Sequence, residues 1–461
     1  MRFISRRELL SNAAGGFGGI ALASMLADQA NAGSRAEDPF APKQPHMPPR
    51  AKRVIFIFLN GGCSHIDAFD HKPRLWKDAG KPVDFYEWQG IPGDHKFFIK
   101  HPQWKFRPGG KCGMLISDLF PHCREIADDI CMINSMASDH TNHYEATLGM
   151  HTGSFTFARP SVGAWVSYGL GTENRNLPSF VVLTPSLPYA GAQAFGSDFL
   201  PGSHQGTLIT PGNTPIADLR PRSKTDELQR LELELIAEAN RKGLGGGPED
   251  VALEARIRSF ETAFGMQREA PEVFDLSREK DSTLESYGLK RGEKKGFAWQ
   301  CLVARRFAEK GVRFIELINS NWDQHGDMLG HVPLAKQVDQ PVAALIQDLK
   351  QRGMLEDTLV VFTTEFGRTP HHVDKNAKGR EHHHQVFSSW FAGAGVKPGY
   401  VHGQSDHYGI EPAVDKVHLH DFHATILHML GLDHERLTFH HAGRDYRLTD
   451  VYGRVVHELL L

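Results

Sequence analysis

Continuous apolar runs, rather than alternating apolar and polar positions, mark the strands that this sequence predicts. The clearest run, Arg53–Leu59, reads RVIFIFL and leads into a tight turn at Asn60-Gly61-Gly62. Such a run is typical of a strand that is buried on both faces of a parallel sheet. Comparable strands are expected at residues 130–136, 180–183, 312–318, 359–364 and 386–391.

Segments with helical periodicity alternate with these strands. Helices are predicted at residues 116–129, 144–150, 297–310, 334–352 and 421–430. Pro341 is expected to kink or divide the helix that contains it, because proline removes a backbone hydrogen bond and its ring clashes with the preceding turn. The alternation is that of βαβ units, so we expect an α/β fold with a mostly parallel central sheet flanked by helices.

Residues 223–270 depart from this alternation. Apolar and charged positions recur there at helical spacing on both sides of Gly243–Pro248, which predicts a helical hairpin inserted into the main domain. No internal repeat is found. A chain of 461 residues can hold one large domain or two medium ones. We assign residues 51–461 to one α/β domain that carries the helical insertion at 223–270.

The first 50 residues predict export. Ser5–Leu10 reads SRRELL, a twin-arginine signal, and the apolar stretch Ala13–Ala27 is too short and too glycine-rich to span a bilayer. Ala30-Asn31-Ala32 is an A-x-A cleavage site, so residues 1–32 are expected to form a signal peptide. Residues 33–50 contain five prolines and read as an extended linker. A periplasmic or extracellular protein without a stable membrane span is expected; the alternative is a chance Arg-Arg pair before an apolar helix.

Composition narrows the class of function. A hydrophobic content of 40% and a charged content of 23% are those of a soluble globular protein. The formal net charge of -3, without a run of Lys and Arg, argues against a nucleic-acid binder. The 27 histidines are the one excess, and they fit metal binding or acid–base chemistry. The five cysteines have no CxxC spacing, so an exported protein would keep at least one free thiol or form no disulfides.

Three clusters of acidic residues and histidines lie next to predicted strands. Asn321–His325 and Thr363–Arg368 each follow a strand, and Gly379–His384 precedes one. Loops beyond the carboxyl ends of strands form the ligand crevice of an open α/β sheet. Converging carboxylates and imidazoles predict a divalent-metal site there, with Zn or Mn favoured over Ca. The expected ligands are Asp323, His325, Glu365, His382 and His383. The alternative is a set of solvated loop histidines.

The turn after the first strand carries further candidates. Ser64, His65, Asp67 and Asp70 follow its glycines closely, over the carboxyl end of the strand. Asp67 is expected to assist as a metal ligand, and Ser64 to act as a nucleophile or as a hydroxyl that orients a ligand. The same residues also fit a turn-capping set that has no catalytic function.

Asp139–Glu145 leads into the helix predicted at 144–150. A helix N-terminus offers free amides and the positive end of the helix dipole, a natural seat for a phosphate or sulfate oxyanion. His143 is therefore expected to act there as nucleophile or general base. Ordinary N-capping by the polar residues of this stretch is the alternative. Arg368 offers a guanidinium that can clamp an oxyanion bidentately, and it is expected to stabilise the transferring group.

At these residues the chain resembles the alkaline phosphatase/sulfatase superfamily. Thr363–Gly367 looks like the Thr-x-Asp-His pair of that superfamily, with Glu for Asp and Phe for His. His143–Gly153 resembles the sulfatase stretch that runs from the nucleophile to Thr-Gly, with His143 at the nucleophile's position. Asn60 stands where the first-strand Asp would be, and Asp421–Gly431 is similar to the closing helix.

Four longer segments resemble a bacterial exported family of unknown function within that superfamily, domain of unknown function 1501. They read GGCSHIDAFDHKP, RPSVGAWVSYGLG, TTEFGRTP and LTFHHAGRDYRLTDVYGRVV, and the resemblance covers essentially the whole mature chain. It implies a sulfatase-like α/β fold. The departures at Asn60, His143 and Phe366 imply a weakened two-metal site. The lack of a Cys-x-Pro-x-Arg motif argues against a sulfatase that uses formylglycine.

Three hypotheses follow. The leading one is an exported metal-dependent hydrolase that acts on a small-molecule or polysaccharide ester of sulfate or phosphate. The second is a catalytically silent protein that binds a carbohydrate or a partner through the same crevice, and retained metal without turnover would favour it. The third is a metal store or chaperone built on the histidine excess.

Overall fold

The computed structural model describes residues 41–83, 96–217, 219, 225–243 and 248–461. Nearly all of them belong to one compact unit, Pro42–Leu461. The expected signal peptide and the first part of the expected linker lie outside the described residues. A search of the described segments finds no helix long and apolar enough to cross a bilayer.

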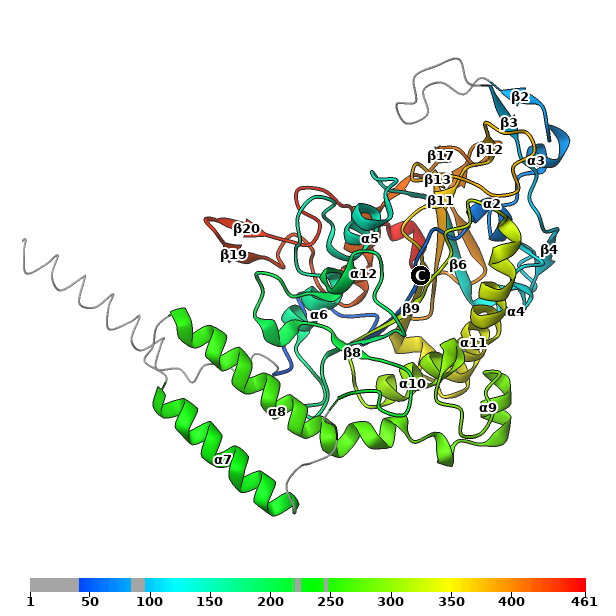
Figure 1. The fold of residues 1–461 in the computed structure, drawn as a ribbon. Coiled ribbons are helices and arrows are strands. Elements are labelled where there is room, and N and C mark those ends of the chain that lie inside the picture. Colours follow the sequence, from blue (N-terminus) through cyan, green and yellow to red (C-terminus); the bar gives the residue numbers. More distant parts are fainter. Residues whose placement is uncertain (1–40, 84–95, 218, 220–224, 244–247) are drawn as a thin grey trace, which may run out of the picture. The chain divides into compact units, whose positions relative to one another are not determined.

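A mixed, mostly parallel sheet forms the centre of this unit (Figure 1). Its central strand β1 (Arg53–Leu59) lies between β9 (Phe314–Asn319) and β10 (Thr358–Thr363), parallel to both. Beyond β9 the parallel order continues through β7 (Phe180–Leu183) to β8 (Thr207–Ile209). The apolar runs that predicted these strands are buried because helices cover both faces of the sheet, and the expected α/β class is confirmed.

Two strands on the other side of β10 reverse direction in turn. β14 (Phe387–Ala392) is antiparallel to β10, and β6 (Ile130–Ala137) is antiparallel to β14. The short strands β15 (Tyr400–His402) and β18 (Val417–His418) pair with β6 in parallel. Because β14 runs against β10, the chain enters β14 at the same edge of the sheet at which β1, β9 and β10 end. That edge carries the candidate site.

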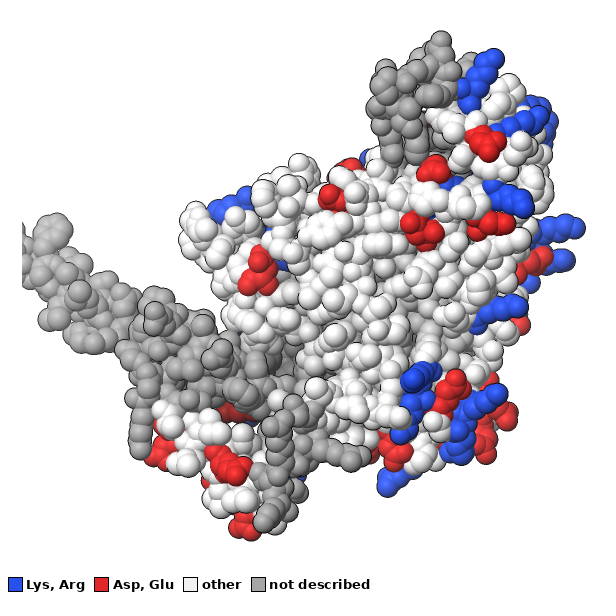
Figure 2. Space-filling view, in the orientation of Figure 1, with Lys and Arg blue, Asp and Glu red and all other residues white. Residues whose placement is uncertain are grey.

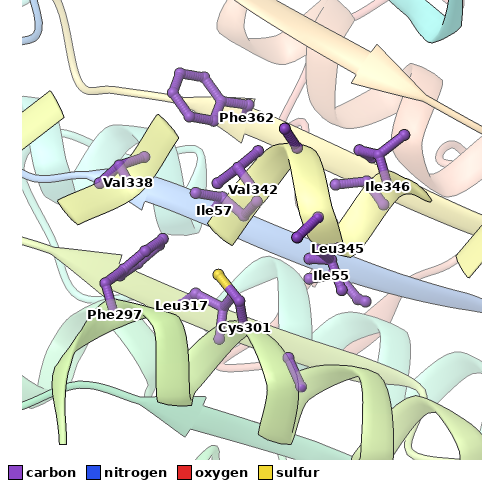
Figure 3. Packing of buried hydrophobic residues seen from close by; sticks show 14 of the residues in the cluster. Ile55, Ile57, Phe297, Cys301, Leu317, Val338, Val342, Leu345, Ile346 and Phe362 are labelled. Carbon is purple, nitrogen blue, oxygen red and sulfur yellow. The ribbon is translucent and has the colours of Figure 1, made fainter. Parts of the chain in front are cut away.

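Alternate residues of β1 face two different helical layers. Ile55 and Ile57 pack against α10 (Gly296–Glu309) and α11 (His331–Gln351), as Figure 3 shows. Phe56 and Phe58 belong to the opposite core. That core is covered by α5 (His143–Thr152), α6 (Val162–Leu170) and α12 (Leu419–Met429). Figure 1 shows the two groups of helices on opposite sides of the sheet. Each face of β1 is therefore buried by its own set of helices.

Two helix predictions are wrong in detail. Residues 116–129 do not form one helix, because β5 (Met114–Ser117) pairs with β4 (Phe106–Gly109) and a new helix, α4 (Pro121–Glu125), starts only at its proline. α11 contains Pro341 without being divided. Its buried apolar positions pack along the sheet, and this packing outweighs the backbone hydrogen bond that the proline removes.

The predicted helical hairpin corresponds to two helices, α7 (Asp226–Gly243) and α8 (Pro248–Phe274). Gln229 of α7 donates to Gln267 of α8 at 2.7 Å. The described part of the linker is bonded to the main unit, since the amide of Lys43 donates to Leu170 at 2.9 Å and that of Met47 to Gly431 at 3.1 Å. On the face seen in Figure 2, Lys and Arg side chains lie beside Asp and Glu rather than in a separate basic patch.

Candidate metal centre

Five segments meet at the edge of the sheet where β1, β9 and β10 end. They are the turn Asn60–Gly62, the loop 319–325, residues 364–366, the first turn of α5, and β13 (His382–His383) just before β14. β13 pairs with β11 (Gly367–Arg368) in a short antiparallel ladder. The three clusters of the sequence therefore come together, because two follow parallel strands and the third precedes an antiparallel one.

Gly61 allows two of these loops to pack closely. Its φ of +124° is outside the range of ordinary side chains. A Cβ atom at this position would lie 2.6 Å from the amide nitrogen of Trp322 and 2.7 Å from that of Asp323. The turn after β1 thus needs glycine both for its backbone conformation and for its contact with the loop after β9.

Three imidazoles and one carboxylate converge at this edge. His143, Asp323 and His382 each offer a ligand atom within 4.8 Å of the others. The Nε2 atoms of His143 and His382 lie 3.2 Å from Asp323 Oδ2 and Oδ1, respectively. His325 extends the cluster, since its Nε2 is 2.9 Å from both Asp323 Oδ1 and His382 Nε2. We call these four residues the Asp323 cluster.

Each imidazole of the Asp323 cluster is held from behind through its Nδ1. The three acceptors, each 2.7 Å away, are Glu365 for His143, Glu381 for His325, and the backbone carbonyl of Thr141 for His382. A carbonyl or an ionised carboxylate can only accept, so the ring hydrogen lies on Nδ1 in each case. The Nε2 atoms are left with their lone pairs directed toward Asp323 and one another, as in metal-ligating histidines.

This arrangement suits a cation. Two imidazole lone pairs 2.9 Å apart, those of His325 and His382, repel each other unless a proton or a metal ion lies between them. The Nε2 of His143 is buried and makes no hydrogen bond of acceptable geometry, although it is 3.2 Å from Asp323. Nitrogen and oxygen donors in this mixture fit a transition metal such as Zn.

The charges of the cluster agree with a cation site. Burial would raise the pKa of Asp323, but the neighbouring His143, His382 and Arg368 hold it well below its usual range. Burial lowers the pKa of His382, and the neighbouring Arg368 lowers it further. Burial also acts to lower the pKa of His143, but Asp323 and Glu365 outweigh that effect and raise it. The cluster thus offers an ionised carboxylate and, in His382, an imidazole that resists protonation.

His143 is also fixed by two aromatic rings. Tyr189 stacks on it with ring centroids 4.2 Å apart and an angle of 14°, and Phe366 lies 4.8 Å away at 34°. Phe366 is itself 4.6 Å from the ring of His382. Phe366 stands where the superfamily motif has a histidine, and here it supports two imidazoles as a fully buried ring. Helix capping occurs at the same place, because the Asn142 side chain accepts the amide hydrogen of Tyr144 at 3.0 Å.

Asp67 and Ser64 do not lie where they were expected. Asp67 is fully buried and pairs with Arg380, with Nε 2.6 Å from Oδ2, and it accepts the amide hydrogen of Gln103 at 2.9 Å. Ser64 donates to Asp67 at 2.6 Å and is itself fully buried. The residue expected as a metal ligand and the residue expected as a nucleophile are therefore bonded to each other, and Arg380 neutralises the carboxylate.

The structure also places His383 and Arg368 differently from the expectation. Successive residues of a strand point to opposite sides, so His383 of β13 turns away from the Asp323 cluster, and its Nε2 lies 2.5 Å from the carbonyl of Ile410. Arg368 has no exposed side-chain surface. It donates to Asp323 at 2.8 Å and to the backbone carbonyls of Gly61, Gly62, Trp322 and Arg380. These contacts tie the loops together, and the fully buried guanidinium offers no exposed surface for clamping an oxyanion.

Two residues that contact the site carried no role in the sequence analysis. Glu381 lies inside the third cluster, and its position next to His382 was an available signal. Tyr189 lies in an irregular segment after β7 with no motif, so no signal in the sequence marked it. None of the five cysteines forms a disulfide in the structure. Burial raises the pKa of the Cys63 thiol, which disfavours the reactive thiolate form.

The family model described as "Protein of unknown function (DUF1501)" matches residues 51–460. The chain belongs to the DUF1501 family. The match spans every segment that builds the Asp323 cluster, from the turn after β1 to β13. The resemblance seen in the four longer sequence segments is thereby confirmed. A search of the curated proteins finds no match.

Several solved structures are similar to this DUF1501 protein at low identity. A sulfatase, PsFucS1 from Pseudoalteromonas sp., is 13% identical over 85% of this chain and 69% of its own, with a TM-score of 0.35. The phosphonate monoester hydrolase SpPMH from Silicibacter pomeroyi is 11% identical over 88% and 76%, with a TM-score of 0.36. The alkaline phosphatase from the Antarctic bacterium TAB5 is 12% identical over 78% and 94%, with a TM-score of 0.30. Such distant similarity assigns no role to any residue of the Asp323 cluster.

Proposed function

We propose that this protein is an exported, metal-dependent hydrolase of sulfate or phosphate esters. The observation that carries the proposal is the convergence of three imidazole Nε2 atoms on the ionised carboxylate of Asp323. The cluster lies at the edge where the crevice of an open α/β sheet takes its ligand. The resemblance of the surrounding motifs to the alkaline phosphatase/sulfatase superfamily supports ester hydrolysis as the chemistry.

The donor set favours Zn or Mn over Ca, because Ca takes oxygen ligands. Zn–N distances of about 2.1 Å place tetrahedral ligand atoms about 3.4 Å apart. The separations of 2.9 and 3.2 Å in the Asp323 cluster are a few tenths of an ångström shorter. Small side-chain movements, without a change of backbone, would open the cluster to accept such an ion.

His143, Asp323 and His382 are the residues that would hold the metal, with His325 as a further donor. A divalent metal bound there would supply positive charge for an ester oxygen and a water molecule of lowered pKa. In this proposal His143 is a metal ligand, whereas the resemblance led us to expect a nucleophile at this position. Its side chain is only 10% exposed, whereas that of His325 is 40% exposed. Substrate would therefore approach from the side of His325.

The protein itself supplies orientation. Glu365 is fully buried and accepts from His143, from the amide of Gly61 at 2.8 Å and from the Thr364 hydroxyl at 3.1 Å. It keeps the hydrogen of His143 on Nδ1. Arg368 holds Asp323 in place and favours its ionised form. These contacts fix the cluster before any ligand arrives, which reduces the cost of ordering it.

Export is supported by the twin-arginine motif at Ser5–Leu10 and the A-x-A site at Ala30–Ala32. The twin-arginine route carries folded proteins, so a metal could be loaded in the cytoplasm before export. This part of the proposal rests on the sequence alone, because both segments lie outside the described residues.

The test is elemental analysis of protein exported by its own signal, followed by assays with aryl sulfates, phosphomonoesters and phosphodiesters. We expect a bound transition metal and turnover of one ester class. His143→Ala should lose both the metal and the turnover. His440→Ala is the control, because that imidazole is 71% exposed and pairs with Asp445, outside the Asp323 cluster.

Two results would contradict the proposal in different ways. Wild-type protein that holds only Ca, or no metal, would remove the metal centre. Bound transition metal with no turnover on all three ester classes would instead favour the second hypothesis, a silent protein that binds a carbohydrate or a partner in the same crevice.

A further inference from the structure

His325 is the most exposed imidazole of the Asp323 cluster, and one side chain holds it from behind. Its Nδ1 lies 2.7 Å from Glu381 Oε2, and the other carboxylate oxygen of Glu381 lies 3.3 Å from His372 Nε2. Glu381 is 34% exposed and His372 is 16% exposed. A row of three side chains therefore leads outward from the cluster, with the carboxylate in the middle.

The backbone around Glu381 is well anchored. Its amide donates to the Thr369 hydroxyl at 3.1 Å, and its carbonyl accepts the amide hydrogen of Thr369 at 2.9 Å. Glu381 directly precedes β13, which is paired with β11. The carboxylate thus extends from a short sheet with fixed register, rather than from a free loop.

The loop that carries His325 is joined to the same segment. The carbonyl of Gln324 accepts the amide hydrogen of Arg380 at 3.2 Å, and the amide of Met328 donates to the carbonyl of Lys378 at 3.1 Å. On one segment the bonded residues, Gln324 and Met328, lie on either side of His325, and on the other segment both bonded residues closely precede Glu381. The backbone sets the distance between them, but the direction of the His325 ring still depends on its side-chain contacts.

Among those contacts, the one with Glu381 sets the orientation of the His325 ring. The Nε2 of His325 faces Asp323 and His382, which offer no fixed hydrogen for it to accept, since His382 carries its hydrogen on Nδ1. Glu381 is the partner that the structure gives to Nδ1 of His325. Without it, this half-exposed ring could move its hydrogen to Nε2 or rotate away from the cluster. Partners of this kind orient metal-ligating histidines and raise their basicity.

We propose that Glu381 is a positioning residue, which keeps the ring hydrogen of His325 on Nδ1 and so directs the Nε2 lone pair into the metal centre. The inference rests on the proposed metal-dependent function, and it adds a residue to which no role was assigned. His372 supports Glu381 from the far side at the longer distance of 3.3 Å, so its contribution is the smaller one.

The test compares Glu381→Ala with Glu381→Gln in the full exported chain. Zn affinity is measured by competition with a chromophoric chelator, and the visible absorption of Co-substituted protein reports the geometry of the ligands. Glu381→Ala is expected to weaken Zn binding about 10–100-fold, the usual effect of losing such a partner, and to change the Co spectrum. Glu381→Gln keeps an oxygen that can accept from Nδ1 and should fall between wild type and Glu381→Ala. Glu356→Ala, an exposed glutamate distant in sequence, is the control and should match wild type.

A second measurement needs neither metal nor turnover. In metal-free protein, the nitrogen shifts of His325, assigned by comparison with His325→Gln, should show the hydrogen on Nδ1 in wild type and lose that preference in Glu381→Ala. Unchanged Zn affinity and an unchanged Co spectrum in Glu381→Ala would overturn the inference, as would an unchanged hydrogen position. If Glu381→Ala loses Zn affinity but the wild type hydrolyses no ester, the role of Glu381 stands and only the proposed hydrolase is contradicted.

Discussion

The Nε2 atoms of His325 and His382 lie 2.9 Å apart, although each ring already presents its Nδ1 hydrogen to an acceptor on the other side. One imidazole comes from the loop after β9 and the other from the strand that precedes β14. Neutral rings in this arrangement repel each other, so the folded chain holds two lone pairs together in advance of a cation. This relationship links the fold to the proposed metal centre.

The first prediction concerns the charge at the centre of this cluster. Asp323→Asn should keep the shape of the side chain and remove the anionic ligand, so metal affinity should fall steeply. With metal at 100 times the wild-type Kd, binding stabilises the native state by about 2.7 kcal/mol, and the variant should lose most of that. Differential scanning calorimetry with and without metal measures the effect, because other losses of folding energy are common to both scans.

His440→Ala is the matched control for Asp323→Asn, since it removes an imidazole outside the cluster. It should leave the metal-induced increase in Tm unchanged. An equal increase in Asp323→Asn and in wild type would mean that the metal, if bound, does not use Asp323.

The second prediction separates Asp67 from the metal centre. Asp67→Ala removes one partner of a fully buried ion pair and leaves the guanidinium of Arg380 uncompensated. Such losses cost about 3–5 kcal/mol of unfolding free energy, which urea denaturation of the metal-free protein would detect. The metal content of the folded fraction should stay at the wild-type value. A stable variant with reduced metal content would show that Asp67 is a metal ligand, as the sequence predicted.

A third prediction concerns a buried pair beneath α5. His151 Nε2 lies 2.8 Å from Glu316 Oε1, and its Nδ1 lies 2.7 Å from the carbonyl of Thr147. Both ring nitrogens face acceptors, which favours the doubly protonated ring. Burial would lower the pKa of His151, but Glu316 outweighs it and raises the pKa above its usual value.

A pKa raised by folding stabilises the native state fully below the unfolded-state value of about 6.5, and this stabilisation is lost as the pH rises through the folded-state value. The gap in unfolding free energy between wild type and His151→Gln should therefore be larger at pH 6 than at pH 9. Denaturant titrations across that range measure it. A gap that grows toward high pH would show that His151 is neutral in the folded protein.

The fourth prediction concerns export. Changing Arg6 and Arg7 together to Lys keeps the charge of the N-terminus but removes the arginine pair that the export receptor reads. The uncleaved precursor should then accumulate in the cytoplasm, as fractionation and immunoblotting would show. Normal export of this double variant would indicate a different route.

Part of the site could be read from the order of residues alone. Asp323, His325 and Glu365 directly follow buried apolar runs, and the ends of parallel neighbours meet at one edge. His382 was harder to place, because it precedes its strand. Only the antiparallel direction of β14, which depends on pairing with β10 and β6, brings it to the same edge.

The sequence could not show which of two similar residues joins the site. His382 and His383 are adjacent and chemically identical, yet the pleat of β13 directs them to opposite sides. Asp67 and Asp323 are both carboxylates near strand ends, but Arg380 neutralises the first, whereas three imidazoles surround the second. These outcomes depend on which long-range partner each side chain meets.

The sequence by itself determined the α/β class, the strands of the parallel core, the family, and the edge of the sheet that carries the chemistry. It could do so because buried runs, helical periodicity and motifs are local properties of the chain. Tertiary structure alone decided which residues form the cluster, that Glu365 supports His143 from behind, and that Arg368 is enclosed by backbone carbonyls. The physical reason is that ligand convergence depends on strand direction, side-chain facing and competition for charged partners, which are settled only when distant segments pack together.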